Sequence, residues 1–137
     1  MRRKNFAVLG SLLLVATVAW TTACGNGNSA LNPNFQPQIS NQTDNFQFQT
    51  TGISNVTQTL TYTWQNTGTG SSVNQACAIT AGTAFVTLKD ANGIAVYSAD
   101  LKANGTFTSI QGMPGKWTII VMLTKVNGTL NFRTQKM

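Results

Sequence analysis

Apolar and polar residues alternate with a period of two along most of the chain after Asn45. One clear run places Leu60, Tyr62 and Trp64 between threonines. Because successive side chains of a β-strand point to opposite faces, this pattern predicts half-buried strands. The apolar positions of the predicted strands are Phe46 and Phe48; Leu60, Tyr62 and Trp64; Val73, Cys77 and Ile79; Ala84, Val86 and Leu88; Ile94 and Val96; Phe107; Trp117, Ile119, Val121 and Leu123; and Leu130 and Phe132. No segment in this region has a helical period, so about eight strands are predicted.

Asn-Gly dipeptides separate several of these segments. They occur at Asn92-Gly93, Asn104-Gly105 and Asn127-Gly128. Asn-Gly favours tight hairpins because both residues tolerate a positive φ. Short strands at this spacing are typical of sandwiches and barrels. We therefore expect residues 45–137 to form one all-β domain, an antiparallel β-sandwich with an Ig-like or jelly-roll topology.

The first of these dipeptides predicts a specific hairpin register. A three-residue loop with Gly93 in the left-handed conformation sets Leu88 opposite Val96 and Thr87 opposite Tyr97. The face opposite Leu88 and Val96 then carries the candidate ligand-binding residues Phe85, Thr87, Lys89 and Tyr97. An exposed aromatic pair beside hydroxyl and amino groups suits a sugar ring or a protein partner. The alternative is that a neighbouring segment covers both rings.

The first 23 residues have the organisation of an export signal. Residues 2–4 are basic, residues 6–20 contain no charge, and small residues precede Cys24. A positive start, an apolar middle and small residues before a cleavage site are typical of secretory signals. Residues 1–23 are therefore predicted to be a signal peptide, although an uncleaved membrane anchor and an ordinary secretory signal are the alternatives.

The end of this signal, Thr22-Ala23-Cys24, resembles a bacterial lipobox, with Thr21 in place of the usual leucine. The resemblance implies lipidation of Cys24 and a membrane anchor in the bacterial cell envelope. If the host has two membranes, Gly25 implies the outer membrane. Residues 24–44 contain Pro33 and Pro37, glycines and many asparagines, and are predicted to be the lipidated cysteine followed by a flexible tether.

The C-terminal third resembles the closing hairpin of secreted bacterial β-sandwich modules. The residues that carry this resemblance are Gly115, Trp117, Ile119 and Val121, followed by Gly128, Leu130 and Phe132. Pre-peptidase C-terminal domains and the jelly-roll domains of secreted proteases end in a similar pattern. The resemblance implies a sandwich fold and an accessory or binding role.

Charge and composition exclude several function classes. The basic residues that follow the leader are scattered, and with three Asp they leave a net charge near +3, so no nucleic-acid-binding patch is predicted. There is no His and no Glu. Most groups for acid–base catalysis and soft-metal binding are therefore missing, and neither an enzyme nor a metal or other cofactor is expected.

Two remaining polar residues have structural explanations. Cys77 shares strand parity with Val73 and Ile79, and is predicted to be a buried core residue because no base is present to activate its thiol. Asp90 precedes a turn, which favours a turn role over a weak ion site. The sequence as a whole predicts a lipid-anchored envelope protein with a non-catalytic structural or protein-interaction role. The alternative is a carbohydrate-binding module.

Overall fold

The computed structural model describes residues 35–137, and this region consists of seven β-strands without a helix. All pairings between the strands are antiparallel. The strands are β1 (Gln38–Gln42), β2 (Asn45–Asn66), β3 (Ser71–Gln75), β4 (Ala78–Lys89), β5 (Ala95–Asp100), β6 (Gly105–Thr108) and β7 (Gly115–Lys136). The all-β prediction is confirmed. No helix in the described region is long and apolar enough to cross a membrane.

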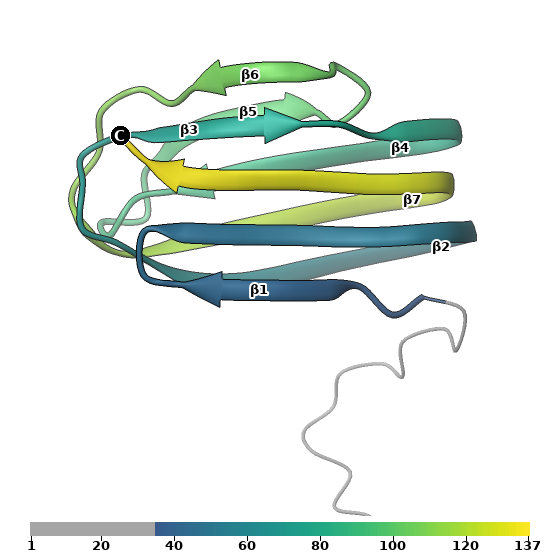
Figure 1. The fold of residues 1–137 in the computed structure, drawn as a ribbon, viewed down its shortest axis with the longest axis horizontal. Coiled ribbons are helices and arrows are strands. Elements are labelled where there is room, and N and C mark those ends of the chain that lie inside the picture. Colours follow the sequence, from purple (N-terminus) through teal and green to yellow (C-terminus); the bar gives the residue numbers. More distant parts are fainter. Residues whose placement is uncertain (1–34) are drawn as a thin grey trace, which may run out of the picture.

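One continuous sheet folds over on itself to make both layers of the sandwich. Strands β2 and β7 each have 22 residues and pair with one another along most of their length. Each strand runs along one layer, bends, and continues in the other layer (Figure 1). Strands β2 and β7 each cover what the sequence pattern divides into two strands, and β1 was not predicted, so the structure has seven strands instead of about eight.

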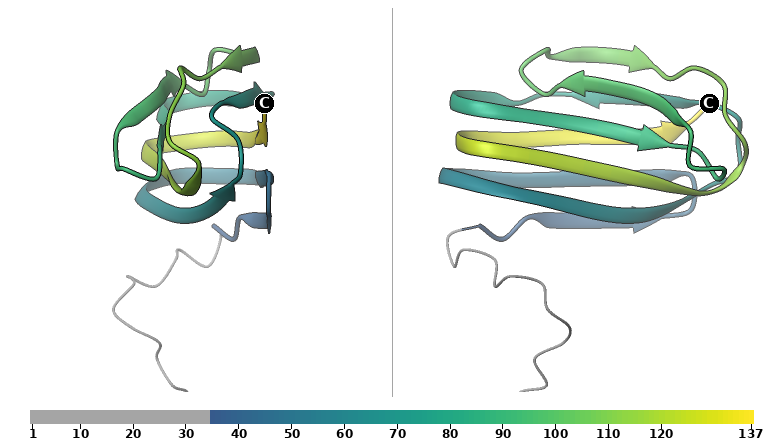
Figure 2. Two further views of the ribbon diagram at one scale, coloured as in Figure 1. Left: turned by 90° about the vertical axis from the view of Figure 1, so that its left-hand side faces the viewer. Right: turned by 180° about the vertical axis from the view of Figure 1, so that it is seen from behind.

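The two layers can be named by their strands. The front layer has the order β1, residues 45–50 of β2, residues 129–136 of β7, β3 and β6. The back layer contains residues 58–66 of β2, residues 115–123 of β7, β4 and β5. The views from the end and from behind show the two layers lying face to face (Figure 2). The sheet is open, since β1 and β6 remain at the edges of the front layer.

Positive-φ residues cluster where the sheet bends. Five of the nine positive-φ residues in the described region lie there: Gly52 and Asn55 in β2, Gly82 in β4, and Lys125 and Gly128 in β7. The strand registers shift at the same places, between Thr50 and Gln58 and between Ile79 and Thr83. Extra residues of this kind bend a strand, and glycine adopts a positive φ without a steric penalty. The predicted hairpin at Asn127-Gly128 is therefore wrong, because this dipeptide bends a single strand.

The core fills the space between the layers. Trp64 and Trp117 lie opposite each other in the back layer, with ring centroids 5.8 Å apart in an edge-to-face arrangement. Phe48 and Phe132 are stacked in the front layer at 5.3 Å. The fully buried residues include most of the predicted core: Phe46, Phe48, Trp64, Val73, Ala84, Val86, Leu88, Trp117, Ile119, Val121 and Leu130. The period-two alternation thus identified most inward-facing positions correctly, whereas the predicted strand position Ile94 is 59% exposed and precedes β5.

The folded structure includes residues before the predicted domain boundary at residue 45. Strand β1 lies inside the predicted tether, and Phe35 is fully buried in the core. All five residues of β1 are exposed, so the strand has no alternation of buried and exposed positions that would reveal it in the sequence. Residues 1–34, which contain the predicted signal peptide and Cys24, lie outside the described region.

Candidate functional site

The β4–β5 hairpin has a different register from the predicted one. Gly93 has the predicted positive φ of 79°, but Leu88 pairs with Tyr97 and Thr87 pairs with Ser98. The register shifts between Leu88 and Lys89, because Val96 is an additional residue on β5. A bulge of this kind reverses the faces of the residues that follow it. The predicted pairs Leu88–Val96 and Thr87–Tyr97 are therefore wrong.

The bulge turns Tyr97 toward the inside of the sandwich. Its hydroxyl donates a hydrogen bond to Gln75 Oε1 at 2.6 Å, and its ring lies 6.4 Å from that of Phe107. Burial raises the pKa of the Tyr97 hydroxyl. Tyr97 thus connects β5 in the back layer to β3 and β6 in the front layer. It does not form an exposed aromatic pair with Phe85.

The other three predicted residues share the outer face of the back layer. Phe85, Thr87 and Lys89 alternate along β4 with the buried Val86 and Leu88. In the adjacent part of β7, Met122 pairs with Phe85 and Ile120 pairs with Thr87. On the far side of β7, these two residues pair with Thr59 and Thr61 of β2. Residues paired across antiparallel strands point to the same face, so they form one surface. We call it the Phe85 face; it consists of Phe85, Thr87, Lys89, Thr59, Thr61, Ile120 and Met122.

The centre of the Phe85 face is apolar. Phe85 is 43% exposed and Met122 is 52% exposed, and they are direct cross-strand neighbours. Hydroxyl groups flank this pair on β2 and β4, and on the β5 side Phe85 pairs with Asp100. Thr87 Oγ1 lies 3.1 Å from Ser98 Oγ on β5. Sequence reasoning missed Ile120 and Met122, although their parity opposite Trp117, Ile119 and Val121 already indicated that they face outward. An apolar centre with polar neighbours of this kind can bind a partner.

The aspartates are engaged in turns. Asp90 is 4% exposed, and its carboxylate accepts hydrogen bonds from the backbone N–H groups of Met113, Ile94 and Asn92. The first two of these bonds are the main cause of the lowered pKa of Asp90. Asp90 therefore has the turn role that the sequence favoured. The contact with Met113, on a distant loop, was not predicted.

Asp44 closes the β1–β2 turn. Its carboxylate accepts a hydrogen bond from the backbone N–H of Thr67, which is the largest cause of its lowered pKa, and it forms a 3.0 Å ion pair with Lys136. Asp100 accepts a hydrogen bond from the backbone N–H of Lys102. Within residues 35–137, no group of three or more potential ligands among Cys, Asp, Glu and His is placed to hold a metal ion.

Cys77 lies between β3 and β4 and is 7% exposed, which confirms the prediction of a buried residue. Burial raises the pKa of its thiol. The backbone of Cys77 is held by the side chain of Asn104, which accepts from the Cys77 N–H at 2.7 Å and donates to its carbonyl at 2.9 Å. Asn104-Gly105 thus lies at a turn, but this turn does not form a hairpin, because β6 pairs with β3 and not with β5.

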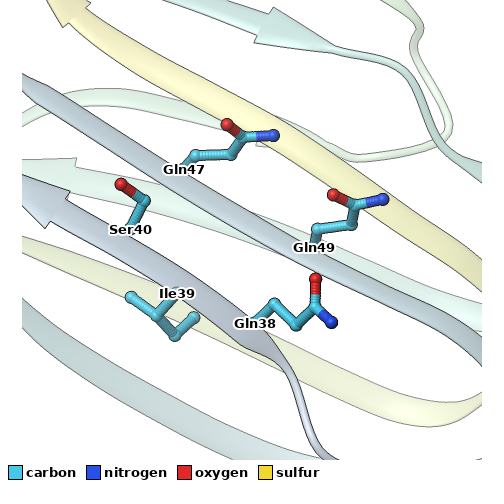
Figure 3. A pocket seen from close by; sticks show the side chains of 5 residues that line it. All are labelled: Gln38, Ile39, Ser40, Gln47 and Gln49. Carbon is cyan, nitrogen blue, oxygen red and sulfur yellow. The ribbon is translucent and has the colours of Figure 1, made fainter.

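A small hollow lies on the outer face of the front layer, at the β1 edge. It has a volume of about 170 Å³ and is lined by Gln38, Ile39, Ser40, Gln47 and Gln49. Gln47 and Gln49 project from β2 on the same side as Ser40 and Gln38 of β1 (Figure 3). The lining therefore consists mainly of uncharged amide and hydroxyl groups. These groups can exchange hydrogen bonds with a neutral polar ligand.

No protein-family model matches the sequence, and a search of curated proteins finds no significant match.

Proposed function

We propose that this chain is a lipid-anchored, non-catalytic binding protein of a bacterial cell envelope. In this proposal Cys24 carries the lipid anchor, and the Phe85 face binds another envelope protein. The exposed Phe85–Met122 pair is the observation that carries the protein-binding role. Both side chains are large, apolar and more than two-fifths exposed, and they lie side by side on a regular sheet.

The composition of the Phe85 face favours a protein partner. Protein interfaces are enriched in Phe and Met at their centres and have polar rims. In the Phe85 face, Met122 and Ile120 lie between Thr59 and Thr61 on one side and Phe85 and Thr87 on the other. Lys89 is charged, and Asp100 of the neighbouring strand β5 pairs directly with Phe85 on the same side. Removal of the central apolar area from water would contribute most of the binding free energy.

A carbohydrate ligand is the second candidate, but it is now supported by a different surface. Because Tyr97 points inward, Phe85 lacks the aromatic partner that the sequence suggested. The hollow between β1 and β2 instead offers the amide groups of Gln38, Gln47 and Gln49. Such groups can pair with the hydroxyl groups of a neutral glycan.

Site-specific photocrosslinking in intact cells tests the protein-binding role. A photoreactive amino acid at Thr61, inside the Phe85 face, should give a discrete crosslinked product. The same group at Thr106, on the front layer, is the matched control and should not give that product. Replacement of Phe85 and Met122 by serine should abolish the Thr61 product. A Thr61 product that persists in this double variant, or the absence of any product specific to Thr61, would count against the Phe85 face.

Two further measurements address the anchor and the glycan. Cys24→Ala should move the protein from the membrane fraction to the soluble envelope fraction. A melting-temperature screen of residues 25–137 against neutral polysaccharides tests the hollow, since a saturating ligand stabilises the folded state. A shift that is lost in Gln47→Ala but kept in Phe85→Ala would favour the carbohydrate role.

A further inference from the structure

The exposed edge of β1 differs from the other edges of the folded sheet. An unpaired strand edge presents free N–H and C=O groups, and proteins usually protect such edges with charges, bulges, short strands or covering segments. Within residues 35–137 there are four edges, formed by β1, β6, β5 and the second half of β2. Three of these four carry a recognisable protection.

The protections differ from edge to edge. Strand β5 has the bulge at Val96 and ends in Asp100, and β6 has only four residues. The second half of β2 is capped by the β1–β2 region: the carbonyl of Thr63 accepts from Asn41 Nδ2 at 2.8 Å, and that of Gln65 accepts from the N–H of Asp44 at 2.8 Å. These three edges are therefore poor templates for a further strand.

Within residues 35–137, β1 has no charge, bulge or covering segment along its length, and it is one residue longer than β6. Its sequence, Gln38-Ile39-Ser40-Asn41-Gln42, contains no charge and no proline, and all five residues are exposed. Its register with β2 is continuous, so no bulge twists the edge away. Pro37, directly before the strand, cannot donate a backbone hydrogen bond and limits any pairing to these five residues.

We propose that β1 pairs antiparallel with β1 of a second copy of this chain, around a two-fold axis at Ser40. The strand is self-complementary in this arrangement. Gln38 lies opposite Gln42 of the second copy, and Ser40 lies opposite its counterpart, so amide meets amide and hydroxyl meets hydroxyl on the outer face. On the other face Ile39 lies opposite Asn41, whose amide already donates to the Thr63 carbonyl of its own copy. No like charges face each other.

The existing β1–β2 pairing shows how the new contact extends the sheet. Gln38 already pairs with Gln49, and Gln42 pairs with Asn45, on the same outer face. Self-pairing therefore continues these rows of amide side chains from one copy into the other, and rows of Asn and Gln stabilise stacked strands. The resulting sheet would end at the two protected β6 edges. The assembly therefore closes as a dimer and does not extend into a fibre.

Pairing of two five-residue strands buries little area, so the contact is weak between freely diffusing molecules. The lipid anchor proposed above would confine both copies to one membrane and raise their effective concentration. The pairing itself rests on β1 alone. It can be tested without the anchor and without a partner for the Phe85 face.

A cysteine placed at the proposed two-fold axis gives a direct test with residues 25–137, which contain all strands of the described region and its whole core. Ser40→Cys should form a disulfide-linked dimer under mild oxidation. Thr106→Cys, at the exposed β6 edge, is the matched control. Because directly opposed strand residues have the separation that a disulfide needs, we expect dimer formation at least about tenfold faster for Ser40→Cys. Equal rates would overturn the proposal.

Sedimentation equilibrium gives an independent test. The unsubstituted protein should associate to a dimer as its concentration rises, and Ser40→Lys should prevent this by placing two positive charges opposite each other. Thr106→Lys should associate normally. Circular dichroism would verify that both variants are folded. Self-pairing would be overturned if the unsubstituted protein stays monomeric, or if the dimer persists in Ser40→Lys. If the unsubstituted protein stays monomeric, an extended peptide from another protein becomes the alternative occupant of the β1 edge.

Discussion

Asp90 accepts a hydrogen bond from the backbone N–H of Met113 at 2.9 Å, and this bond joins the β4–β5 turn to the loop before β7. The approach is close: a Cβ atom at Gly112 would lie only 2.7 Å from the Cβ of Asp90. The same carboxylate organises its own turn through the N–H groups of Asn92 and Ile94. One buried side chain thus holds together two loops at the end of the sandwich opposite the bend.

The lowered pKa of Asp90 predicts loss of stability in acid. In the unfolded chain this carboxyl titrates near 3.8, and in the folded protein it titrates lower, chiefly because of the Met113 N–H. Its contribution to the free energy of unfolding is therefore complete above about pH 5 and is lost as the pH falls through the unfolded value toward the folded one. The pKa of Asp44 is also lowered, so its contribution to the free energy of unfolding is likewise lost in acid.

Asp90→Asn should consequently lower the melting temperature at neutral pH. The difference in melting temperature between this variant and the unsubstituted protein should shrink as the pH falls. Thermal unfolding followed by circular dichroism across a pH series measures this. Asp100→Asn is the control. The Asp100 carboxylate accepts one backbone hydrogen bond, from the N–H of Lys102, so this substitution should lower the melting temperature less at neutral pH. If the difference in melting temperature for Asp90→Asn does not change with pH, the stabilising role of the ionised Asp90 carboxylate is contradicted.

Gly82→Ala should destabilise the protein much more than Gly52→Ala. Both glycines have a positive φ, of 78° and 62°, and an alanine in this conformation costs about 1–2 kcal/mol. A Cβ at Gly52 meets open space, whereas one at Gly82 meets the backbone carbonyls of Thr124 and Lys125. Because the backbone at these carbonyls must shift, we expect Gly82→Ala to lower the free energy of unfolding by roughly 3 kcal/mol or more. Urea unfolding compares the two variants; equal costs would mean that the bend is not tightly packed at Gly82.

Trp117→Phe should lower the free energy of unfolding by about 1–3 kcal/mol, from lost packing and a lost hydrogen bond. The indole is fully buried, packs edge-to-face on Trp64, and donates to the carbonyl of Met113 at 2.8 Å. Guanidinium unfolding provides the measurement. Phe85→Ala, on the exposed face, is the comparison and should change the same quantity by no more than about 0.5 kcal/mol. A larger effect for Phe85→Ala would show that Phe85 packs structurally.

Cys77 should react slowly with a thiol reagent in the folded protein. Its thiol is 7% exposed, and burial raises its pKa, so little thiolate is present. In residues 25–137, where Cys77 is the sole cysteine, we expect modification at least about tenfold slower than at an exposed cysteine introduced by Ser98→Cys. Denaturant should remove the protection. Fast reaction of native Cys77 would show that the β3–β4 connection opens readily.

The candidate site shows how far the sequence pattern reaches. Alternation correctly placed Phe85, Thr87 and Lys89 on one outer face, because that parity holds along an uninterrupted strand. It failed for Tyr97, because the bulge at Val96 changes the parity within the hairpin. A bulge depends on packing across the sandwich, where Tyr97 reaches Gln75. The sequence gives no local sign of that contact.

The amino-acid sequence by itself determined the strand-forming regions, the inward-facing residues such as Trp64 and Trp117, the β4–β5 turn at Gly93 and the burial of Cys77. These features follow from alternation and local backbone preference, which act over a few residues. Tertiary structure decided that Asn127-Gly128 bends one long strand and that the polar segment at Gln38 joins the sheet. The physical reason is shared. A positive φ serves a hairpin and a bend equally well, and an exposed edge strand is held by backbone hydrogen bonds that every residue type except proline can make.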